Sequence, residues 1–182
     1  MAQFTVNARR FDPYKNLTGM IETFARVREL CAFDVRLRIV GPADPRYPEA
    51  PRLAEQRGLN RWIDWAGYLS GAELVKAYQE ADLFLLQSKY EGFGLTILEA
   101  MACGTPVVCS NRSSLPEVAG DAAVLVDPDN TEEAATAAVR ILRDKAVAAE
   151  LIERGLRQAA RFTWTRAAAM TLEAYERCMD LR

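Results

Sequence analysis

The chain has 182 residues, of which 50% are hydrophobic and 26% are charged. These proportions are typical of a globular domain and exclude a disordered or low-complexity chain. The formal net charge of -2 gives no overall attraction for nucleic acid or anionic lipid, so we expect no nucleic-acid partner.

The cysteines and the missing histidine limit the chemistry open to this chain. Cys31, Cys103, Cys109 and Cys178 form no CxxC pair, which argues against a zinc site and a disulfide framework. A Ser-His-Asp or Cys-His mechanism is excluded for this chain alone because it contains no histidine. We therefore assign no metal and expect a reducing setting.

Short apolar runs alternate with longer amphipathic segments from the start of the chain to residue 126. The runs predicted as strands are FTVNA, RLRIVG, WIDWAG, LFLLQ, PVVCS and AVLV. The helices predicted between them cover residues 15–31, 51–58, 72–81 and 95–103. This alternation predicts an α/β fold: a Rossmann-like doubly wound parallel sheet of about six strands, covered on both faces.

Extra C-terminal helices follow the last strand, at residues 131–143, 146–161 and 164–181. Two pairs, Ser70 with Glu73 and Asn130 with Glu133, have capping-box spacing ahead of a helical run. No repeat or linker interrupts the pattern, so residues 1–182 are predicted to form one domain. No apolar run approaches the length that spans a bilayer, so we expect no transmembrane segment.

Residues 89–110, KYEGFGLTILEAMACGTPVVCS, form the most informative segment. Gly92 and Gly94 follow a predicted buried strand and precede a helix at the carboxyl edge of the sheet, where open α/β folds bind ligands. A helix start presents unpaired N–H groups and a positive dipole end, so residues 91–95 suit a diphosphate. Gly94 lets the backbone approach closely, and Thr96 adds a hydroxyl donor. A simple tight turn is the alternative for Gly-Phe-Gly alone.

Two carboxylates strengthen the ligand hypothesis. Glu91 lies in the loop, and Glu99 lies one turn inside the helix, stacked over Leu95 and leaning back toward the phosphate end. Their separation suits a ligand contacted at two places along its length. For Glu91 alone, a first-turn carboxylate that complements the helix dipole is the alternative.

The sequence EGFGLTILEAMACGTPVV resembles the E-x7-E segment of the family-4 glycosyltransferases, which have the two-domain GT-B fold. ARRFDPYKN resembles the Gly-Arg-x4-Lys turn of that family, with Arg10 and Lys15 at the matching spacing. On its own, this pair is equally typical of a solvated charge cluster at a helix start. Three further stretches extend the resemblance over almost the whole chain: WIDWAGYLSGAELVKAYQEADLFLLQS, NRSSLPEVAGDAAVLVDPDN and RFTWTRAAAMTLEAYE.

The resemblance implies one half of a GT-B fold that binds a nucleotide-sugar donor, UDP- or GDP-linked, and transfers the sugar with retention and without a metal or other cofactor. Arg10 and Lys15 would clamp the diphosphate, Glu99 would hold the ribose, and Glu91 would hold the sugar. Arg10, Lys15 and Glu91 are the implied catalytic residues. The implied donor-binding residues are Arg10, Lys15, Tyr68, Leu69, Glu91, Gly92, Phe93, Gly94, Leu95, Thr96 and Glu99. Packing is the alternative for Tyr68.

The resemblance also implies partners and a location. The acceptor would bind a missing N-terminal domain, so this chain alone is expected to be inactive. The location implied is cytoplasmic, with a peripheral membrane association left open for the full-length enzyme. A non-catalytic nucleotide-binding or scaffold domain is the alternative function, and a related sugar-nucleotide epimerase is a third.

Several features remain ambiguous in the sequence. The glycine and proline usual in the family are replaced by Arg9 and Gln87. Asp127-Pro128-Asp129 has an Asp-x-Asp spacing, but a turn is the better interpretation. The apolar stripe of the last helix, Trp164, Tyr175 and Met179, would by default face the core. The resemblance instead implies an exposed helix that crosses to the other domain and is prone to self-association.

Overall fold

The computed structural model describes residues 2–7 and 11–180, so the predicted site residue Arg10 and the neighbouring Arg9 lie outside the described residues. Within these ranges, six strands form one sheet in the order β3-β2-β1-β4-β5-β6, and every neighbouring pair is parallel. The predicted doubly wound parallel sheet is confirmed. The strands are β1 (Ala2–Asn7), β2 (Val35–Val40), β3 (Ile63–Gly67), β4 (Leu83–Leu86), β5 (Val107–Ser110) and β6 (Val124–Val126).

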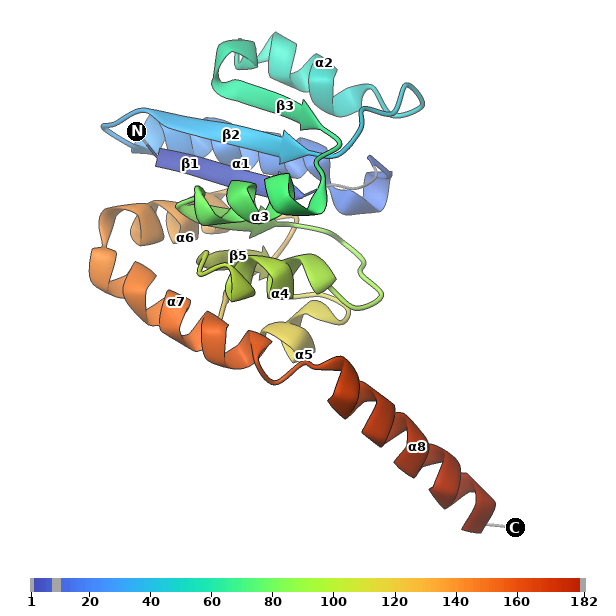
Figure 1. Ribbon diagram of the computed structural model, residues 1–182. Coiled ribbons are helices and arrows are strands. Elements are labelled where there is room, and N and C mark those ends of the chain that lie inside the picture. Colours follow the sequence, from blue (N-terminus) through green and yellow to red (C-terminus); the bar gives the residue numbers. More distant parts are fainter. Residues whose placement is uncertain (1, 8–10, 181–182) are drawn as a thin grey trace.

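Helices cover both faces of the sheet (Figure 1), with α1 packed against α2 and α6, and α4 against α3 and α7. Three short elements, η1, η2 and α5, are absent from the prediction because they are too brief to show helical periodicity. The helices are η1 (Pro13–Lys15), α1 (Leu17–Leu30), α2 (Glu49–Gln56), η2 (Asn60–Trp62), α3 (Gly71–Gln79), α4 (Leu95–Ala102), α5 (Leu115–Ala119), α6 (Thr131–Arg143), α7 (Lys145–Ala159) and α8 (Trp164–Asp180).

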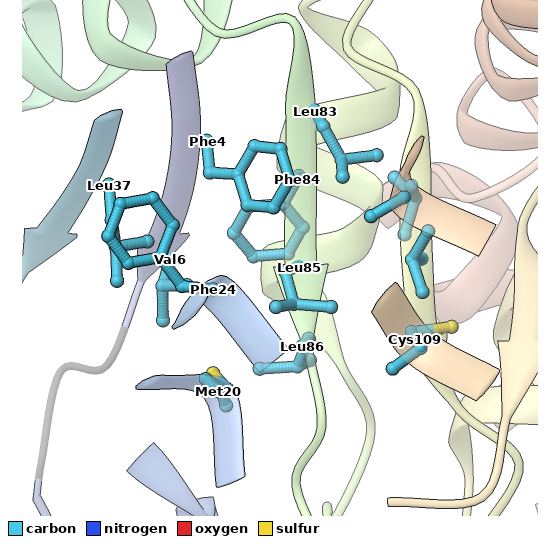
Figure 2. Packing of buried hydrophobic residues seen from close by; sticks show 14 of the residues in the cluster. Phe4, Val6, Met20, Phe24, Leu37, Leu83, Phe84, Leu85, Leu86 and Cys109 are labelled. Carbon is cyan, nitrogen blue, oxygen red and sulfur yellow. The ribbon is translucent and has the colours of Figure 1, made fainter. Parts of the chain in front are cut away.

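The core lies around the central strands β1 and β4. All four residues of β4, LFLL, are buried, as a strand covered on both faces requires. Phe4 of β1 meets Phe24 of α1 edge to face, with ring centroids 6.2 Å apart. Figure 2 shows these rings beside Phe84 and the leucines of β4. The packing holds α1 against the sheet and so positions the turn that precedes α1.

The two predicted capping boxes differ in outcome. At the start of α3, the N–H and hydroxyl of Ser70 both donate to the Glu73 carboxylate, and the box is complete. At the start of α6, Asn130 accepts from the N–H of Glu133 at 3.1 Å, but the Glu133 carboxylate accepts from the N–H of Asp127. The second helix start is therefore tied to the preceding turn.

Gln87, which replaces the family's proline, ties the end of β4 to α1. Its side chain is fully buried, and its Oε1 accepts from the Thr23 hydroxyl of α1 at 2.8 Å. Its main-chain carbonyl accepts from the Asn16 side-chain amide at 3.1 Å. The Gln87 Nε2 finds no hydrogen-bond partner within the described ranges. Gln87 therefore links β4 to α1, two elements that flank the candidate site.

The last helix does not pack into the core. Trp164 of α8 is 86% exposed and Tyr175 is 65% exposed. Figure 1 shows α8 extending away from the sheet and its covering helices. The default interpretation of this stripe as core-facing was wrong, and the exposed helix implied by the resemblance is what the structure has. No described helix has the combination of length and apolar character that a membrane span requires.

We predict that Thr23→Val and Gln87→Leu are coupled in their effect on stability. Thr23→Val leaves the buried Gln87 Oε1 without its donor and should lower the free energy of unfolding by ~1–3 kcal/mol. The double variant removes both polar groups and should lose less than the sum of the single variants. Urea unfolding followed by circular dichroism measures all four proteins, and strictly additive losses would contradict the link.

Candidate functional site

The candidate site lies at the carboxyl edge of the sheet, where the strand order reverses between β1 and β4. The loops that follow these two strands leave in opposite directions, and ligands of open α/β folds bind in the crevice between such loops. Lys15 ends η1 after β1, and Glu91 lies in the loop after β4. The sheet topology therefore brings together two residues that the sequence analysis assigned to one site.

Lys15 and Glu91 form an ion pair across this crevice. The Lys15 Nζ lies 2.7 Å from the Glu91 Oε1, although the two residues are 76 positions apart in the sequence. Their side chains are 18% and 12% exposed. The Lys15 ammonium also lies 5.4 Å from the centroid of the Tyr14 ring, within reach of a cation–π contact. A partly buried cation thus stands beside the loop that leads into α4.

Main-chain contacts join the loop after β1 to the loop after β4. The Lys89 N–H donates to the Tyr14 carbonyl at 2.7 Å. Asn16, buried at a left-handed φ of 55°, donates through its side-chain amide to the carbonyls of Gln87 and Pro128. Asn tolerates this conformation better than most residues. The position of Lys15 is consequently set by the backbone on both sides of it.

The start of α4 depends on Gly94. This residue is the N-cap at φ 100°, in the left-handed region. A Cβ added here would lie 2.6 Å from Leu115 Cδ2, whereas one added at Gly92 would meet no atom within 4 Å. The sequence analysis explained Gly94 by the approach of a ligand. The structure adds a second reason for glycine at position 94, because Leu115 of α5 packs against its backbone.

The remaining loop residues are partly exposed around the helix start. Phe93 and Leu95 are exposed, and Thr96 is half-buried. The Phe93 ring meets Phe162 edge to face at a centroid distance of 5.9 Å. This contact connects the loop to the segment between α7 and α8.

Glu99 is oriented by α3. Its Oε2 accepts a hydrogen bond at 3.0 Å from the hydroxyl of Tyr78, which is almost fully buried. The Tyr78 carbonyl in turn accepts from the Thr105 hydroxyl at 2.7 Å. The Glu99 side chain is half-buried on the first turns of α4 and is held by a rigid partner.

Tyr68 and Leu69 line a cavity of about 350 Å³ between the loops that follow β2 and β3. Tyr68 is 83% exposed, so the alternative that it serves core packing was wrong. The cavity lies on the same carboxyl edge of the sheet as Lys15. It is lined by Val40, Gly41, Pro42, Tyr68, Leu69, Gly71 and Leu74.

The Asp-x-Asp segment forms the predicted turn. The Asp129 N–H donates to the Asp127 carboxylate at 3.0 Å, and the Asn130 N–H donates to the Asp127 carbonyl at 2.9 Å. Arg112 pairs with both carboxylates, and Lys89 lies 2.6 Å from Asp129 and lowers its pKa. Within the described part of the chain, no group of three or more acidic or cysteine side chains is placed to hold a metal.

Cys103 and Cys109, which flank the turn after α4, are not set up as nucleophiles. Cys109 is fully buried, and this burial raises the pKa of its thiol to about 12. Burial, and then the nearby Glu99 carboxylate, raise the pKa of the Cys103 thiol. A raised thiol pKa keeps the reactive thiolate scarce at neutral pH.

Sequence reasoning missed two residues that contact the site. The Glu91 N–H donates to the Ser113 hydroxyl at 2.9 Å, and the Ser114 hydroxyl donates to the Glu91 carbonyl at 2.9 Å. The stretch NRSSLPEVAG carried part of the family resemblance but suggested no role for these serines. Only a fold that places the β5–α5 connection beside the β4–α4 loop reveals the contact.

Comparisons with known proteins show the family and the fold of the chain. Residues 2–158 match the family described as glycosyl transferases group 1. The chain is 36% identical to O-antigen chain mannosyltransferase B of Escherichia coli over 91% of its length, and 33% identical to MMP alpha-(1->4)-mannosyltransferase of Mycolicibacterium hassiacum over 92%. It covers 43% and 41% of these relatives. The structure also superposes on sucrose-phosphate synthase of Thermosynechococcus elongatus with a TM-score of 0.82 and 28% identity, covering 100% of this chain and 46% of that one.

We predict that Gly94→Ala destabilises the chain and that Gly92→Ala does not. Alanine at position 94 meets Leu115 and must adopt a positive φ, which should lower the free energy of unfolding by ~1–3 kcal/mol. Gly92 has open space and no positive φ, so its alanine variant is the matched control. Urea unfolding of both variants checks this, and equal stabilities would contradict the packing of α5 against the helix start.

Proposed function

The chain belongs to the group 1 glycosyltransferases, and we propose that it binds a nucleotide-linked sugar as the donor half of a transfer reaction. We propose mannose as the sugar, because two relatives at 36% and 33% identity are mannosyltransferases. The chain spans about two-fifths of the length of these relatives. The acceptor would therefore bind mainly to parts of the enzyme outside this chain.

The ion pair between Lys15 and Glu91 is the observation that carries this proposal. It supports a donor whose diphosphate lies over the start of α4, with Lys15 beside it. An ammonium has three donors, so Lys15 can contact Glu91 and a phosphate oxygen together. The helix dipole and the unpaired N–H groups of the first turn favour the same anion.

In the proposed reaction, the diphosphate leaves more easily when fixed positive charge lies beside it. As the bond between the sugar and the phosphate breaks, negative charge grows on the leaving phosphate, and preorganised cations and N–H donors stabilise it. In the proposed reaction, Lys15 and the α4 start supply this stabilisation without a metal ion. Arg10 is proposed as a second cation from the same turn, on the strength of the sequence pattern alone.

The two glutamates are proposed to hold the ends of the donor. Glu99, oriented by Tyr78, would accept from the ribose hydroxyls. Glu91, paired with Lys15, would accept from hydroxyls of the sugar. The cavity beside Tyr68 and Leu69 would take the base of a UDP- or GDP-linked donor. We also propose that the enzyme belongs to glycosyltransferase family 4 and transfers the sugar with retention of the anomeric configuration.

We predict that Lys15→Ala and Glu99→Ala each weaken nucleotide binding. Each substitution removes one charge-assisted contact, so the Kd for GDP or UDP should rise ~10-fold or more. Isothermal titration calorimetry with both nucleotides measures this and also identifies the base.

Lys145→Ala and Glu153→Ala are the matched controls, because both residues are exposed on α7, away from the crevice. They should leave the Kd unchanged. Wild-type affinity in both Lys15→Ala and Glu99→Ala would remove the site assignment. Urea unfolding of each variant separates lost contacts from lost folding.

We predict that this chain alone binds the nucleotide but transfers no sugar. Catalysis requires both reactants to be held in one geometry, and the proposed acceptor site lies outside this chain. A radiolabelled GDP-mannose transfer assay with mannosyl oligosaccharide acceptors tests this, beside the nucleotide titration. Multiple turnovers by the 182-residue chain would contradict the division of the site between two domains.

A further inference from the structure

Both main-chain polar groups of Glu91 are held by consecutive serine hydroxyls. The Glu91 N–H donates to the Ser113 Oγ at 2.9 Å, and the Ser114 Oγ donates to the Glu91 carbonyl at 2.9 Å. With the Lys15 ion pair on its carboxylate, Glu91 is contacted from two other loops at three points. Ser113 and Ser114 lie 22 and 23 residues after Glu91 in the sequence, and Lys15 lies 76 residues before it.

Ser113 adopts an unfavourable backbone conformation in making its contact. Its φ is 53°, in the left-handed region that residues other than glycine, asparagine and aspartate rarely occupy. Such strain persists only where surrounding contacts over-determine the conformation, and it gathers at functional sites. The contact that Ser113 makes in this conformation is with the loop that carries Glu91.

The segment that includes these serines is anchored on both sides. Before it, Arg112 pairs with Asp127 at 2.9 Å and with Asp129 at 3.0 Å, and Asp129 also pairs with Lys89. After it, Leu115 packs on Gly94, with its Cδ2 2.6 Å from the position that a Cβ would take there. Residues 112–115 therefore form a brace, which we call the serine brace, along the loop from Lys89 to Gly94.

The middle of the loop, on either side of Glu91, has few restraints of its own. Tyr90 is exposed, and Gly92 has open space around its Cα. A carboxylate on an unrestrained loop samples many directions, and ordering it on binding would reduce affinity. Preorganised groups avoid this loss.

We propose that Ser113 and Ser114 are positioning residues that aim the Glu91 carboxylate at the sugar of the donor. This inference rests on the function proposed above, in which Glu91 holds the sugar. The hydrogen bonds that Ser113 and Ser114 make with this loop both end on the main chain of Glu91. Loss of the serine brace therefore weakens recognition of the sugar and leaves recognition of the nucleotide in place.

The test compares the Kd for GDP-mannose with the Kd for GDP, or the corresponding UDP pair if the wild-type chain binds UDP. Ser113→Ala removes the hydroxyl acceptor and should weaken sugar-nucleotide binding ~5- to 10-fold, the equivalent of about one hydrogen bond, with the nucleotide Kd unchanged. Ser113→Asn should restore much of the loss, because asparagine tolerates a positive φ and offers an acceptor oxygen. Thr171→Ala, which removes an exposed hydroxyl on α8, should change neither Kd.

A double-mutant cycle separates positioning from a general structural role. In a Glu91→Ala background, Ser113→Ala should have no further effect on the difference between the two Kd values, because the group that it positions is absent. Parallel loss of both affinities, or an additive effect in this cycle, would overturn the proposal.

Amide hydrogen exchange tests the serine brace independently of the proposed function. If the wild-type chain binds GDP-mannose no better than GDP, the sugar contact of the proposed function fails before any variant is made. The exchange rate of the Glu91 N–H still tests the brace, since Ser113→Ala should raise it ~5-fold or more relative to the wild type. An unchanged rate would overturn the serine brace itself.

Discussion

The reversal of strand order between β1 and β4 is the constraint on which the rest of this site depends. The loops after these strands diverge, and open α/β folds bind ligands at such a point. Here the two loops are joined by the Lys15–Glu91 ion pair at 2.7 Å and by the hydrogen bond from the Lys89 N–H to the Tyr14 carbonyl. In the proposed function, a diphosphate would lie between Lys15, from the loop after β1, and the positive end of α4, from the loop after β4. The two groups come from different elements, so the strand order decides whether they can act together.

Local strain in this protein lies where the two loops are held together. Among the described residues other than glycine, Asn16 and Ser113 have positive φ values, of 55° and 53°. Asn16 reaches carbonyls on two neighbouring loops, and Ser113 receives the Glu91 N–H. Each unfavourable conformation is offset by hydrogen bonds to a different segment. The hydrogen bonds that offset the strain also position Lys15 and Glu91, so in the proposed function they serve both stability and donor binding.

α8 is exposed and does not pack into the core of this domain. The side chains of its apolar stripe are exposed, and Figure 1 shows the helix extending away from the sheet and the other helices. Large exposed apolar faces mark interaction surfaces. The chain covers less than half of the relatives that it matches, so the proposed division of labour places donor contacts here and acceptor contacts elsewhere in the enzyme.

Local patterns in the sequence by themselves determined most of the elements. The alternation of apolar runs and amphipathic segments predicted six parallel strands, and the bounds of α6, Thr131–Arg143, were predicted without error. Periodicity and caps are properties of neighbouring residues, so they can be read along the chain. The family pattern also assigned Lys15, Glu91 and Glu99 to one site, although their roles stay predictions. Only the tertiary structure decided which distant groups meet: Lys15 with Glu91, Tyr78 with Glu99, Ser113 with the Glu91 N–H, and Gln87 with Thr23. It also decided that Tyr68 and the stripe of α8 are exposed. The physical reason is that these contacts depend on strand order and helix packing, which no short stretch of residues encodes.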